Sequence, residues 1–532
     1  MSDAEYDYVI AGGGSAGCVL AGRLTEDPAT TVCLLEAGGA GESWIVTAPA
    51  AVLLSVPYPV HNWGFETVPQ RGLGGRRGYQ PRGRALGGSS AVNAMVYMRG
   101  HRTDYDRWAA NGAPGWSYAE VLPYFKRAEN NHVHGGEFHG QAGPLDVSDL
   151  RTDNPFPAFF LEAARQAGFP LNRDFNGAEQ EGVGMYQVTQ RNGERCSAAR
   201  AYVHPHLGRP NLKVVTGARA LRVAVEGGRA TGVEYLAGGA RRLARARGEV
   251  VVSAGALQSP QLLMLSGVGD GAELQRHGIA VRHHLPGVGR NLRDHVDYVF
   301  GYRARSLDLF GLSAGGALRL LREIGRYRRE RRGMVTSNYA EAGGFLKTDA
   351  GLPAPDIQLH FVVGVVDNHA RTPHLGHGYS LHVCLLRPKS AGRVGLTGPD
   401  PLAAPEIDPD FYGEAEDLEA MVRAFKLARR ILEAPALAAA SAGDMFTAGV
   451  QSDDQIRETL RQRSDTIYHP VGTCHMGGDA MAVVDAELRV RGLGALRVVD
   501  ASVMPDLIGG NTNAPTIMIG EKASDLIRAA RR

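Results

Sequence analysis

The stretch of residues 6–38, YDYVIAGGGSAGCVLAGRLTEDPATTVCLLEAG, constrains the fold more than any other part of the chain. Residues 6–11 form a short apolar run, which predicts a buried strand. Gly12, Gly14 and Gly17 follow as G-x-G-x-x-G where this strand turns into a helix. These glycines allow a tight turn, let a pyrophosphate approach the backbone and let the helix pack closely. The start of the helix offers free N–H groups and a positive dipole end to that phosphate.

A second strand is predicted over residues 31–35 and ends in Glu36. A carboxylate roughly 20 residues after the glycines can bind an adenosine ribose hydroxyl. Strand, helix, strand and acid in this register predict a dinucleotide-binding site. The alternative is a glycine-rich turn in an ordinary α/β domain.

The composition excludes several classes of protein. The chain has 532 residues, of which 44% are hydrophobic and 21% charged, and this predicts a globular protein with two or more packed cores. A net charge of +2 gives no reason to expect nucleic acid as a partner. The five cysteines are scattered and never spaced C-x-x-C, so no disulfide framework, zinc site or dithiol centre is expected.

The chain also lacks the sequence signals of export and membrane insertion. No apolar run approaches the length of a membrane span. The first strand begins too early to leave room for a signal peptide. We therefore expect a cytoplasmic protein. His132, His134 and His139 crowd one glycine-rich stretch, but we interpret them as loop residues and expect no metal.

A second glycine-rich segment occupies residues 83–95, GRALGGSSAVNAM. Two glycines and two serines open a helical pattern, which makes a second place where backbone N–H groups can contact a phosphate or a cofactor ring. A helix capped by serine is the alternative.

From this segment onward the chain resembles the glucose–methanol–choline family of flavin oxidoreductases. GRALGGSSAVNAMVYMRGHRTDYDRW is similar to the first signature of the family, and GALQSPQLLMLSGVG at 255–269 is similar to the second. The resemblance runs over residues 6–527. Within the family, the chain most resembles the choline dehydrogenase-like branch, especially bacterial aliphatic alcohol dehydrogenases. The segments DFNGAEQEGVGMYQVTQRNGERCSAARAY and SLHVCLLRPKSAGRVGL carry this resemblance.

The resemblance implies an α/β fold, α+β overall, with a Rossmann-like FAD-binding domain and a discontinuous antiparallel-sheet substrate-binding domain. Alternating strands at 219–226 and 230–236 fit a β-meander beside the flavin-binding sheet. We assign residues 1–148, 197–295 and 465–532 to the FAD-binding domain, the last part with the catalytic residues. Residues 149–196 and 296–464 are assigned to the substrate-binding domain.

The resemblance also implies a set of residues that contact FAD. They are Gly12, Gly14, Ser15, Ala16, Gly17, Glu36, Ala37, Arg84, Gly87, Gly88, Ser89, Asn93, Ala94, Met95, Val96, Val215, Ala254, Gly255, Asp500, Ala501, Asn511, Thr512 and Asn513. Asp500 follows a predicted strand at 496–499 and is placed to bind ribityl hydroxyls, with the capping of the next turn as the alternative. Some relatives attach flavin through a histidine just after the Gly-Gly pair. Val92 stands there in this chain, so we expect non-covalent FAD.

The C-terminal segment carries the expected chemistry. YHPVGTCHMG at 468–477 and GGNTNAPT at 509–516 match the family, and by that resemblance His469 is the catalytic base and Asn511 its partner. A neutral imidazole can take the hydroxyl proton of an alcohol at physiological pH, while flavin N5 accepts the carbinol hydride. A second polar group can hold the oxygen in place. A satisfied core histidine is the alternative for His469. We expect a helix from Pro515, capped by Asn513, to direct its positive end at the flavin.

The resulting hypothesis is an FAD-dependent dehydrogenase that oxidises primary aliphatic alcohols and passes electrons to a quinone or another acceptor. An alcohol oxidase that reduces O₂ to H₂O₂, a choline dehydrogenase and a catalytically silent flavin-binding protein are the alternatives. Glu341 is a candidate substrate contact, because an acid there suits a cationic substrate. Residues 319–332, RLLREIGRYRRERR, form a basic amphipathic pattern that predicts peripheral contact with the cytoplasmic face of the inner membrane. A solvated surface helix is the alternative.

Overall fold

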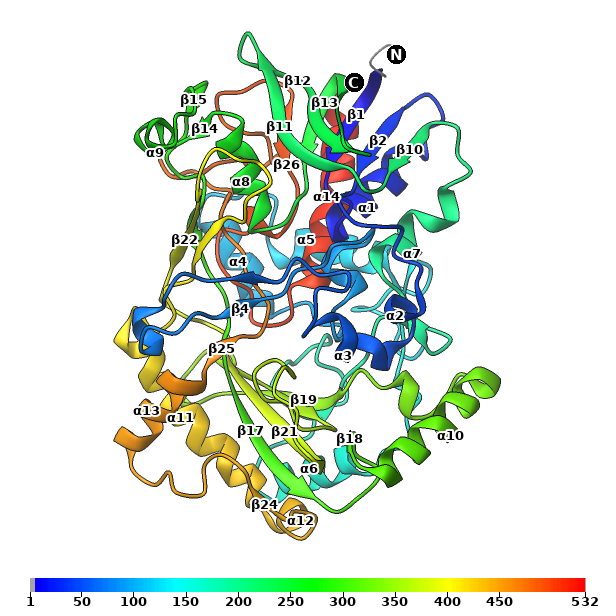
Figure 1. The fold of residues 1–532 in the computed structure, drawn as a ribbon, viewed down its shortest axis with the longest axis vertical. Helices are drawn as coiled ribbons and strands as arrows, with labels where there is room; N and C mark the ends of the chain where they lie inside the picture. The colour runs from blue at the N-terminus through cyan, green and yellow to red at the C-terminus, as the bar shows by residue number, and fades with distance from the viewer. Residues whose placement is uncertain (1–4, 532) are drawn as a thin grey trace.

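The computed structural model describes residues 5–531 and is built around two β-sheets (Figure 1). The first sheet has seven strands, in the order β10-β2-β1-β13-β12-β11 with β26 beside β13. Its strands are β1 (Glu5–Ala11), β2 (Val32–Leu35), β10 (Leu212–Val215), β11 (Arg219–Glu226), β12 (Arg229–Ala237), β13 (Ala240–Val252) and β26 (Leu496–Val498).

The centre of this sheet is parallel. β1 pairs with β2 on one side and β13 on the other, β10 extends it beyond β2, and β26 joins β13, all in parallel register. The residues Val9, Ile10 and Ala11 are fully buried. A continuous apolar run of this kind suits a parallel strand that is covered on both faces. β11, β12 and β13 form an antiparallel meander at the other edge, as the alternating pattern predicts.

Helices from both ends of the chain cover the first sheet. α1 (Ser15–Leu24) follows β1 directly, and α14 (Asn513–Ala530) lies beside it (Figure 1). The fully buried Glu521 of α14 accepts hydrogen bonds from Arg23 of α1 at 2.8 Å, from Tyr202 of α7 (Ala198–Tyr202) at 2.8 Å and from Arg127 of α5 (Tyr118–Ala128) at 2.7 Å. A buried carboxylate is tolerated when several donors compensate it, so this cluster ties four helices into one unit.

The second sheet has eight strands and is antiparallel throughout. Its order is β24-β17-β21-β20-β19-β7, with β18 on β21 and β25 on β17. The strands are β7 (Gly182–Met185), β17 (Val296–Ala304), β18 (Gly311–Leu312), β19 (Ala340–Leu346), β20 (Ile357–Val362), β21 (Gly376–Leu385), β24 (Gly443–Asp444) and β25 (Asp465–Thr466). Helices α6 (Phe156–Gln166) and α11 (Ala415–Leu432) pack on it: the ring of Phe160 stacks on Phe361 at 4.9 Å, and Phe425 contacts Phe300 at 4.6 Å.

The remaining helices connect or cover the two sheets. They are α2 (Trp44–Thr47), α3 (Val52–Ser55), α4 (Arg102–Ala110), α8 (Gln258–Leu265), α9 (Gly271–Arg276), α10 (Ala314–Glu330), α12 (Pro435–Ala438) and α13 (Asp453–Arg463). None of the helices within residues 5–531 is long and apolar enough to cross a bilayer.

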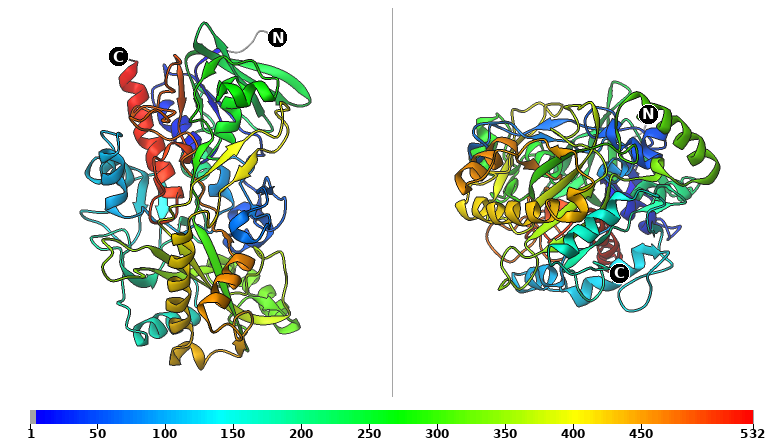
Figure 2. Two further views of the ribbon diagram at one scale, coloured as in Figure 1. Left: turned by 90° about the vertical axis from the view of Figure 1, so that its left-hand side faces the viewer. Right: turned by 90° about the horizontal axis from the view of Figure 1, so that it is seen from below.

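The chain passes repeatedly between the two sheets. β7 joins β19 although more than 150 residues separate them, and β26 returns to the first sheet after the second is complete. A side view shows an elongated molecule with the first sheet and α14 at one end and the second sheet at the other (Figure 2). The mixed α/β architecture with a discontinuous second sheet is confirmed, whereas the domain boundaries stay predictions.

Candidate active site

A cavity of about 370 Å³ lies where the two sheets face each other. The carboxyl ends of β1, β2 and β13 and the first turns of α1 and α14 form one wall. Residues of β19, β20 and β21 form the opposite wall together with α3. Ligands of open α/β sheets bind outside the carboxyl ends of the strands, so the cavity lies where the glycine-rich turn predicts a dinucleotide.

The three glycines of the first turn have different surroundings. Gly12 has φ +114°, and a Cβ there would lie 2.3 Å from the Ser253 carbonyl oxygen. A Cβ on Gly17 would lie 2.0 Å from the Gly12 carbonyl oxygen. Gly14 lines the cavity, and only the Ser253 oxygen, at 3.7 Å, lies near its Cβ position. Gly12 and Gly17 therefore permit the turn itself, and Gly14 leaves room for a ligand to approach the backbone.

The second glycine-rich segment packs directly on the first. A Cβ on Gly88 would lie 2.6 Å from the Gly14 Cα. The expected α-helix is absent at this point: a short 3₁₀ turn, Gly88–Ala91, leads into irregular backbone with an isolated bridge between Val96 and Val188. The reason is tertiary pairing, because the Tyr97 N–H donates to the Gln187 carbonyl (2.9 Å) and Thr189 N–H donates to that of Met95 (2.8 Å).

Glu36 lies at the end of β2 and lines the cavity. Its carboxylate accepts the N–H of Gly13 at 3.0 Å and the N–H of Gly38 at 2.7 Å. Burial nevertheless raises the pKa of Glu36 to about 7. The carboxylate thus holds the glycine turn in shape at the position expected for a ribose contact.

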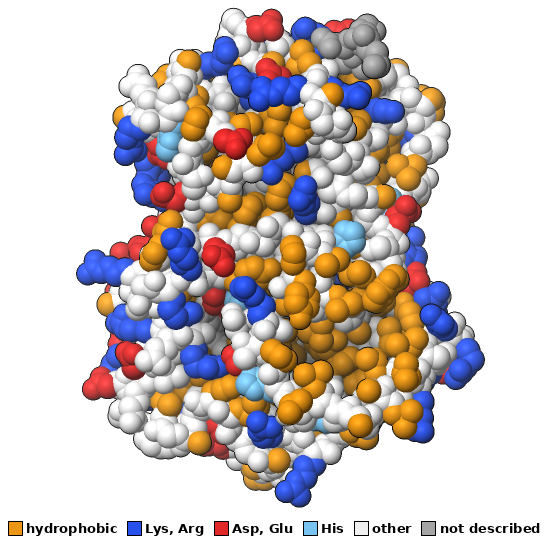
Figure 3. Space-filling view, in the orientation of Figure 1, with side chains coloured by type: hydrophobic (Ala, Val, Ile, Leu, Met, Phe, Trp, Pro, Cys, Tyr) orange, Lys and Arg blue, Asp and Glu red, His pale blue; other side chains and the backbone are white. Residues whose placement is uncertain are grey.

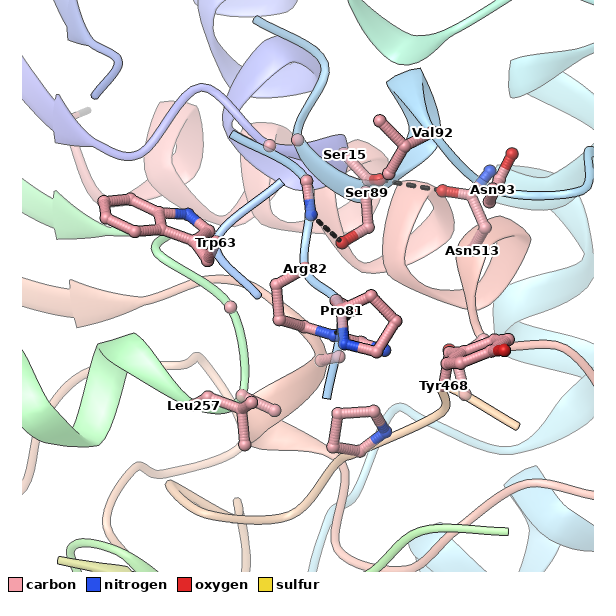
Figure 4. Close-up of a pocket in the computed structure, with 18 of the residues that line it drawn as sticks. Ser15, Trp63, Pro81, Arg82, Ser89, Val92, Asn93, Leu257, Tyr468 and Asn513 are labelled. Atoms are coloured by element: carbon pink, nitrogen blue, oxygen red, sulfur yellow. Dashed lines mark hydrogen bonds between the residues drawn. The ribbon is translucent and has the colours of Figure 1, made fainter. Parts of the chain in front are cut away.

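The first turns of α1 and α14 meet at the cavity. The Ser15 hydroxyl donates to the Asn513 side-chain oxygen at 2.7 Å (Figure 4). The expected cap is therefore wrong: Thr512 is the N-cap of α14, and Asn513 turns its amide to Ser15 instead. Two helix N-termini at one cavity concentrate positive potential and free N–H groups, which suits an anionic ligand.

Asp500 performs the capping that was the alternative to a cofactor contact. Its carboxylate accepts the N–H of Ser502 (2.8 Å), the N–H of Gly255 (2.8 Å) and the hydroxyl of Ser259 (2.5 Å). Burial raises the pKa of Asp500 above its usual value. Asp500 also lines the cavity, so a contact with ribityl hydroxyls stays a prediction.

Most of the expected cofactor residues share this one cavity. Those that line it are Gly12, Gly14, Ser15, Ala16, Glu36, Ala37, Gly88, Ser89, Asn93, Ala94, Met95, Val96, Ala254, Gly255, Asp500, Ala501, Asn511, Thr512 and Asn513. The others support the wall from behind: Gly17 lies against the turn, the Gly87 N–H donates to the Gly13 carbonyl (2.7 Å), and the Val215 carbonyl accepts the Glu36 N–H (2.9 Å).

Arg84 lies outside the cavity and stacks its guanidinium on Trp63, 4.6 Å from the ring centroid. Trp63 and Arg82 do line the cavity, and Figure 4 shows Trp63 on the side opposite Asn513. Neither residue is predicted from the sequence, because both belong to an irregular stretch without a motif. Val92 also lines the cavity.

His469 and Asn511 lie together at the second-sheet end of the cavity. The His469 Nε2 is 3.2 Å from the Asn511 side-chain nitrogen. The loop that carries His469 is fixed by the buried Asp294, which accepts the His469 N–H (2.8 Å) and the Thr466 hydroxyl (2.5 Å). The preceding residue, Tyr468, has φ +75°, a strained conformation for a side chain of this size.

A buried histidine determines the tautomer of His469. The His295 Nε2 lies 3.1 Å from the Ile508 carbonyl oxygen, and the His295 Nδ1 lies 2.9 Å from the His469 Nδ1. A carbonyl can only accept, so His295 carries its proton on Nε2 and offers a bare Nδ1. His469 must then donate from Nδ1, which leaves its Nε2 unprotonated and directed at Asn511.

The Asn511 amide is oriented by the second sheet. Gln358 donates to the Asn511 side-chain oxygen at 2.9 Å, so the Asn511 nitrogen faces His469 and also His360 Nε2, at 3.5 Å. His360 and His382 both line the cavity. His295 belongs to the segment PGVGRNLRDH and could have been noticed there, whereas Gln358 and His360 stand on an apolar strand that gives no signal.

Burial keeps these imidazoles neutral. It lowers the pKa of His469 well below the usual value, and the nearby His295 and His360 lower it further. Burial lowers the pKa of His295 and that of His360 to about 3. His469 is therefore an unprotonated base at neutral pH, which is the state that proton abstraction requires.

Glu341 is turned away from the cavity. It is a buried residue of β19 that accepts the hydroxyl of Ser337 (2.6 Å) and that of Thr152 (2.9 Å), and it does not line the cavity. Burial raises its pKa to about 7. These contacts satisfy both carboxylate oxygens, so the geometry gives no support to a substrate contact. Among residues 5–531, the carboxylates that line the cavity are Glu36 and Asp500, and no cluster is arranged to hold a metal.

The family models of GMC oxidoreductases match this chain over residues 6–297 and 388–520. The chain is 46% identical to an alcohol dehydrogenase [acceptor] of Pseudomonas putida, over 98% of this chain and 95% of the relative. It is also 46% identical to the mitochondrial choline dehydrogenase of Homo sapiens, over 98% and 90%. A solved structure of a formate oxidase variant of Aspergillus oryzae, studied for its FAD modification, superposes on this chain with a TM-score of 0.92 at 27% identity. The match covers 100% of this chain and 99% of the formate oxidase chain.

Proposed function

Because the chain belongs to the GMC oxidoreductase family, we propose that it is an FAD-dependent dehydrogenase that oxidises primary aliphatic alcohols to aldehydes. The observation that carries the proposal is the unprotonated His469 Nε2 beside the Asn511 amide, at the second-sheet end of a largely apolar cavity. A catalytically silent flavin-binding protein would not need a base fixed in one tautomer.

The residues of the wall fit FAD. The first turns of α1 and α14 and the open backbone at Gly14 would hold its pyrophosphate, and Glu36 would bind a ribose. Bound FAD supplies the acceptor for the hydride. Val92 offers no nucleophile where some relatives bond the flavin, which supports non-covalent attachment.

In the proposed reaction the alcohol oxygen lies beside the two polar groups, within hydrogen-bond reach of both. The Asn511 nitrogen donates to that oxygen, and His469 Nε2 accepts the hydroxyl proton. His295 keeps the Nδ1 proton of His469 in place, so the second proton can only be received at Nε2. The buried imidazolium is unfavourable on its own, but the negative charge that develops on the substrate oxygen compensates it.

The lining at the substrate end favours an aliphatic alcohol over choline. It is formed by Val52, Leu53, Val56, Tyr339, Ala340 and Val362 together with His360 and His382. A quaternary ammonium would need a carboxylate or a cage of several aromatic rings. Glu341 is engaged elsewhere, and the tyrosines of the cavity lining are Tyr339 and Tyr468. A quinone or another acceptor is proposed to reoxidise the flavin, with O₂ as the alternative.

The test is anaerobic flavin reduction by a series of 1-alkanols and by choline, followed at the flavin absorbance in a stopped-flow instrument. We expect 1-alkanols to bleach the holoprotein and His469→Ala to retain FAD but lose at least about 100-fold in rate, the lower range for general-base catalysis. His475→Ala is the control, because His475 lies six residues away and outside the cavity. Undiminished reduction by His469→Ala, or reduction by choline alone, contradicts the proposal. Reoxidation by a quinone or by O₂ then identifies the acceptor.

A further inference from the structure

Helix α10 is amphipathic in the opposite sense to an ordinary surface helix. Tyr327 is its only buried residue among residues 314–330. Polar groups fasten it to the protein: Arg319 pairs with Asp308 (2.6 Å) and Arg326 pairs with Asp153 (2.6 Å). Leu318, Leu320, Leu321 and Ile324 are exposed to solvent instead, Leu321 to 67%. A helix that faces only water turns its apolar stripe to the core, so this arrangement leaves the stripe unpartnered.

The exposed leucines continue into a wider apolar face. Leu312 of β18 bridges to Leu375, which is 80% exposed, and α10 follows β18 directly in the chain. Trp44 of α2, at 64%, and Leu54 of α3 are also exposed. Figure 3 shows hydrophobic side chains gathered over α2, α3, β18 and α10, with basic side chains along the edge. We call Trp44, Leu54, Leu312, Leu318, Leu321 and Leu375 the apolar face.

Unpaired cations border this face. Within residues 5–531, Arg322 and Arg328 of α10 have no ion-pair partner, in contrast to Arg319 and Arg326. A two-fold contact with a second copy through this face would bring two sets of these unpaired arginines into one interface, which adds positive charge without adding a carboxylate to pair with it. Phosphate groups of an anionic lipid surface complement the arginines, and tryptophan and leucine are suited to the boundary between headgroups and acyl chains.

We propose that the apolar face docks the protein on an anionic lipid bilayer, with the leucines of α10 below the headgroups and Arg322 and Arg328 on lipid phosphates. The basic segment 319–332 is thus one part of a larger surface that includes α2, α3, β18 and Leu375.

The apolar face lies next to the cavity. Val52 and Leu53 of α3 and Val56 just after it line the cavity, while Leu54 of the same helix belongs to the apolar face. Val366 and Ala370 line the cavity a few residues before Leu375. An apolar molecule dissolved in the bilayer therefore has a short path to the substrate end. The delivery of a substrate from the bilayer to the cavity rests on the proposed function, whereas the docking of the protein on the bilayer does not.

The experiment is co-sedimentation of the holoprotein with vesicles of phosphatidylcholine alone or with added phosphatidylglycerol. We expect binding to the anionic vesicles and at least a tenfold loss of binding for Leu318→Glu with Leu321→Glu. Leu171→Glu with Leu207→Glu is the matched control, because these leucines are similarly exposed but lie outside α10 and the apolar face. Arg322→Gln with Arg328→Gln should weaken binding to anionic vesicles about 30-fold, at about 1 kcal/mol per arginine.

Three results would overturn the proposal: no binding of the parent protein, equal binding of the Leu318/Leu321 variant, or a dimer in gel filtration that this variant dissociates while vesicles bind neither. His469→Ala separates the two proposals, because it should bind vesicles like the parent whatever its activity. Membrane binding with no alcohol oxidation refutes the proposed function alone.

Discussion

The role of His295 leads to the sharpest prediction about the reaction. His295→Phe keeps a ring in the buried site but removes the acceptor for the His469 Nδ1 proton. A buried N–H without a partner costs about 1–3 kcal/mol. His469 then favours the tautomer with its proton on Nε2, which cannot accept the proton of the alcohol. At about 1.4 kcal/mol per factor of ten, flavin reduction should slow by roughly 5- to 150-fold.

The assay is anaerobic stopped-flow reduction of the bound flavin by a 1-alkanol, with the limiting rate and the apparent dissociation constant fitted separately. We expect the limiting rate to fall while the dissociation constant and the FAD content change little, because His295 does not line the cavity. His295→Gln should recover part of the rate, since one amide can accept from His469 and donate to the Ile508 carbonyl.

A structural role for His295 would give a different result. It would lower the FAD content and affect both variants alike. Reduction at the parent rate in His295→Phe, with full FAD content, would show that the tautomer argument is wrong.

Three further predictions follow from the buried groups and the glycine-rich turns. Burial holds the pKa of His469 well below its usual value, so the base stays unprotonated on acidification. The limiting rate of flavin reduction should therefore stay constant from pH 8 to below pH 6.5. A fall of this rate centred at an ordinary histidine pKa would contradict the prediction. The pKa of Glu341, raised to about 7 from 4.5, means that the folded protein prefers the protonated acid and loses stability as pH rises between these values. In urea titrations at pH 5 and pH 8, Glu341→Gln should therefore gain about 3 kcal/mol relative to the parent at the higher pH, with unchanged turnover of 1-alkanols. Gly88→Ala should lower FAD affinity at least tenfold in a fluorescence titration, because its Cβ would meet the Gly14 Cα at 2.6 Å; equal affinity would show that the two turns can separate freely. 

Local signals predicted the parts of the fold that are local. The apolar run before Gly12, the need for glycine at Gly12 and Gly17, and the acid after β2 all act within one strand–helix–strand unit. The prediction of Asn513 as the N-cap of α14 is wrong because the Asn513 amide is held by Ser15, 498 positions earlier. The helix expected after Gly88 gives way to pairing with residues 187–189, which no local propensity reveals.

The candidate site shows the same limit. His469 and Asn511 could be predicted from motifs. Gln358, His360 and His295 contact them only because the fold brings distant parts of the chain together. Glu341 points from β19 toward Ser337 and Thr152, a direction that the sequence does not give. Side-chain direction within a strand depends on register, and a shift of one residue reverses it.

The carboxylate of Glu521 has a consequence for how the protein is made. The ribosome synthesises Arg23 498 residues before the glutamate that neutralises it, and Arg127 394 residues before. Until that late segment emerges, α1 and α5 carry charges whose buried partner does not yet exist, and their apolar sides lack α14. The nascent chain must therefore spend most of its translation with an unfinished N-terminal lobe, a condition that favours holding by chaperones and makes premature termination far more damaging than the loss of a single C-terminal helix would suggest.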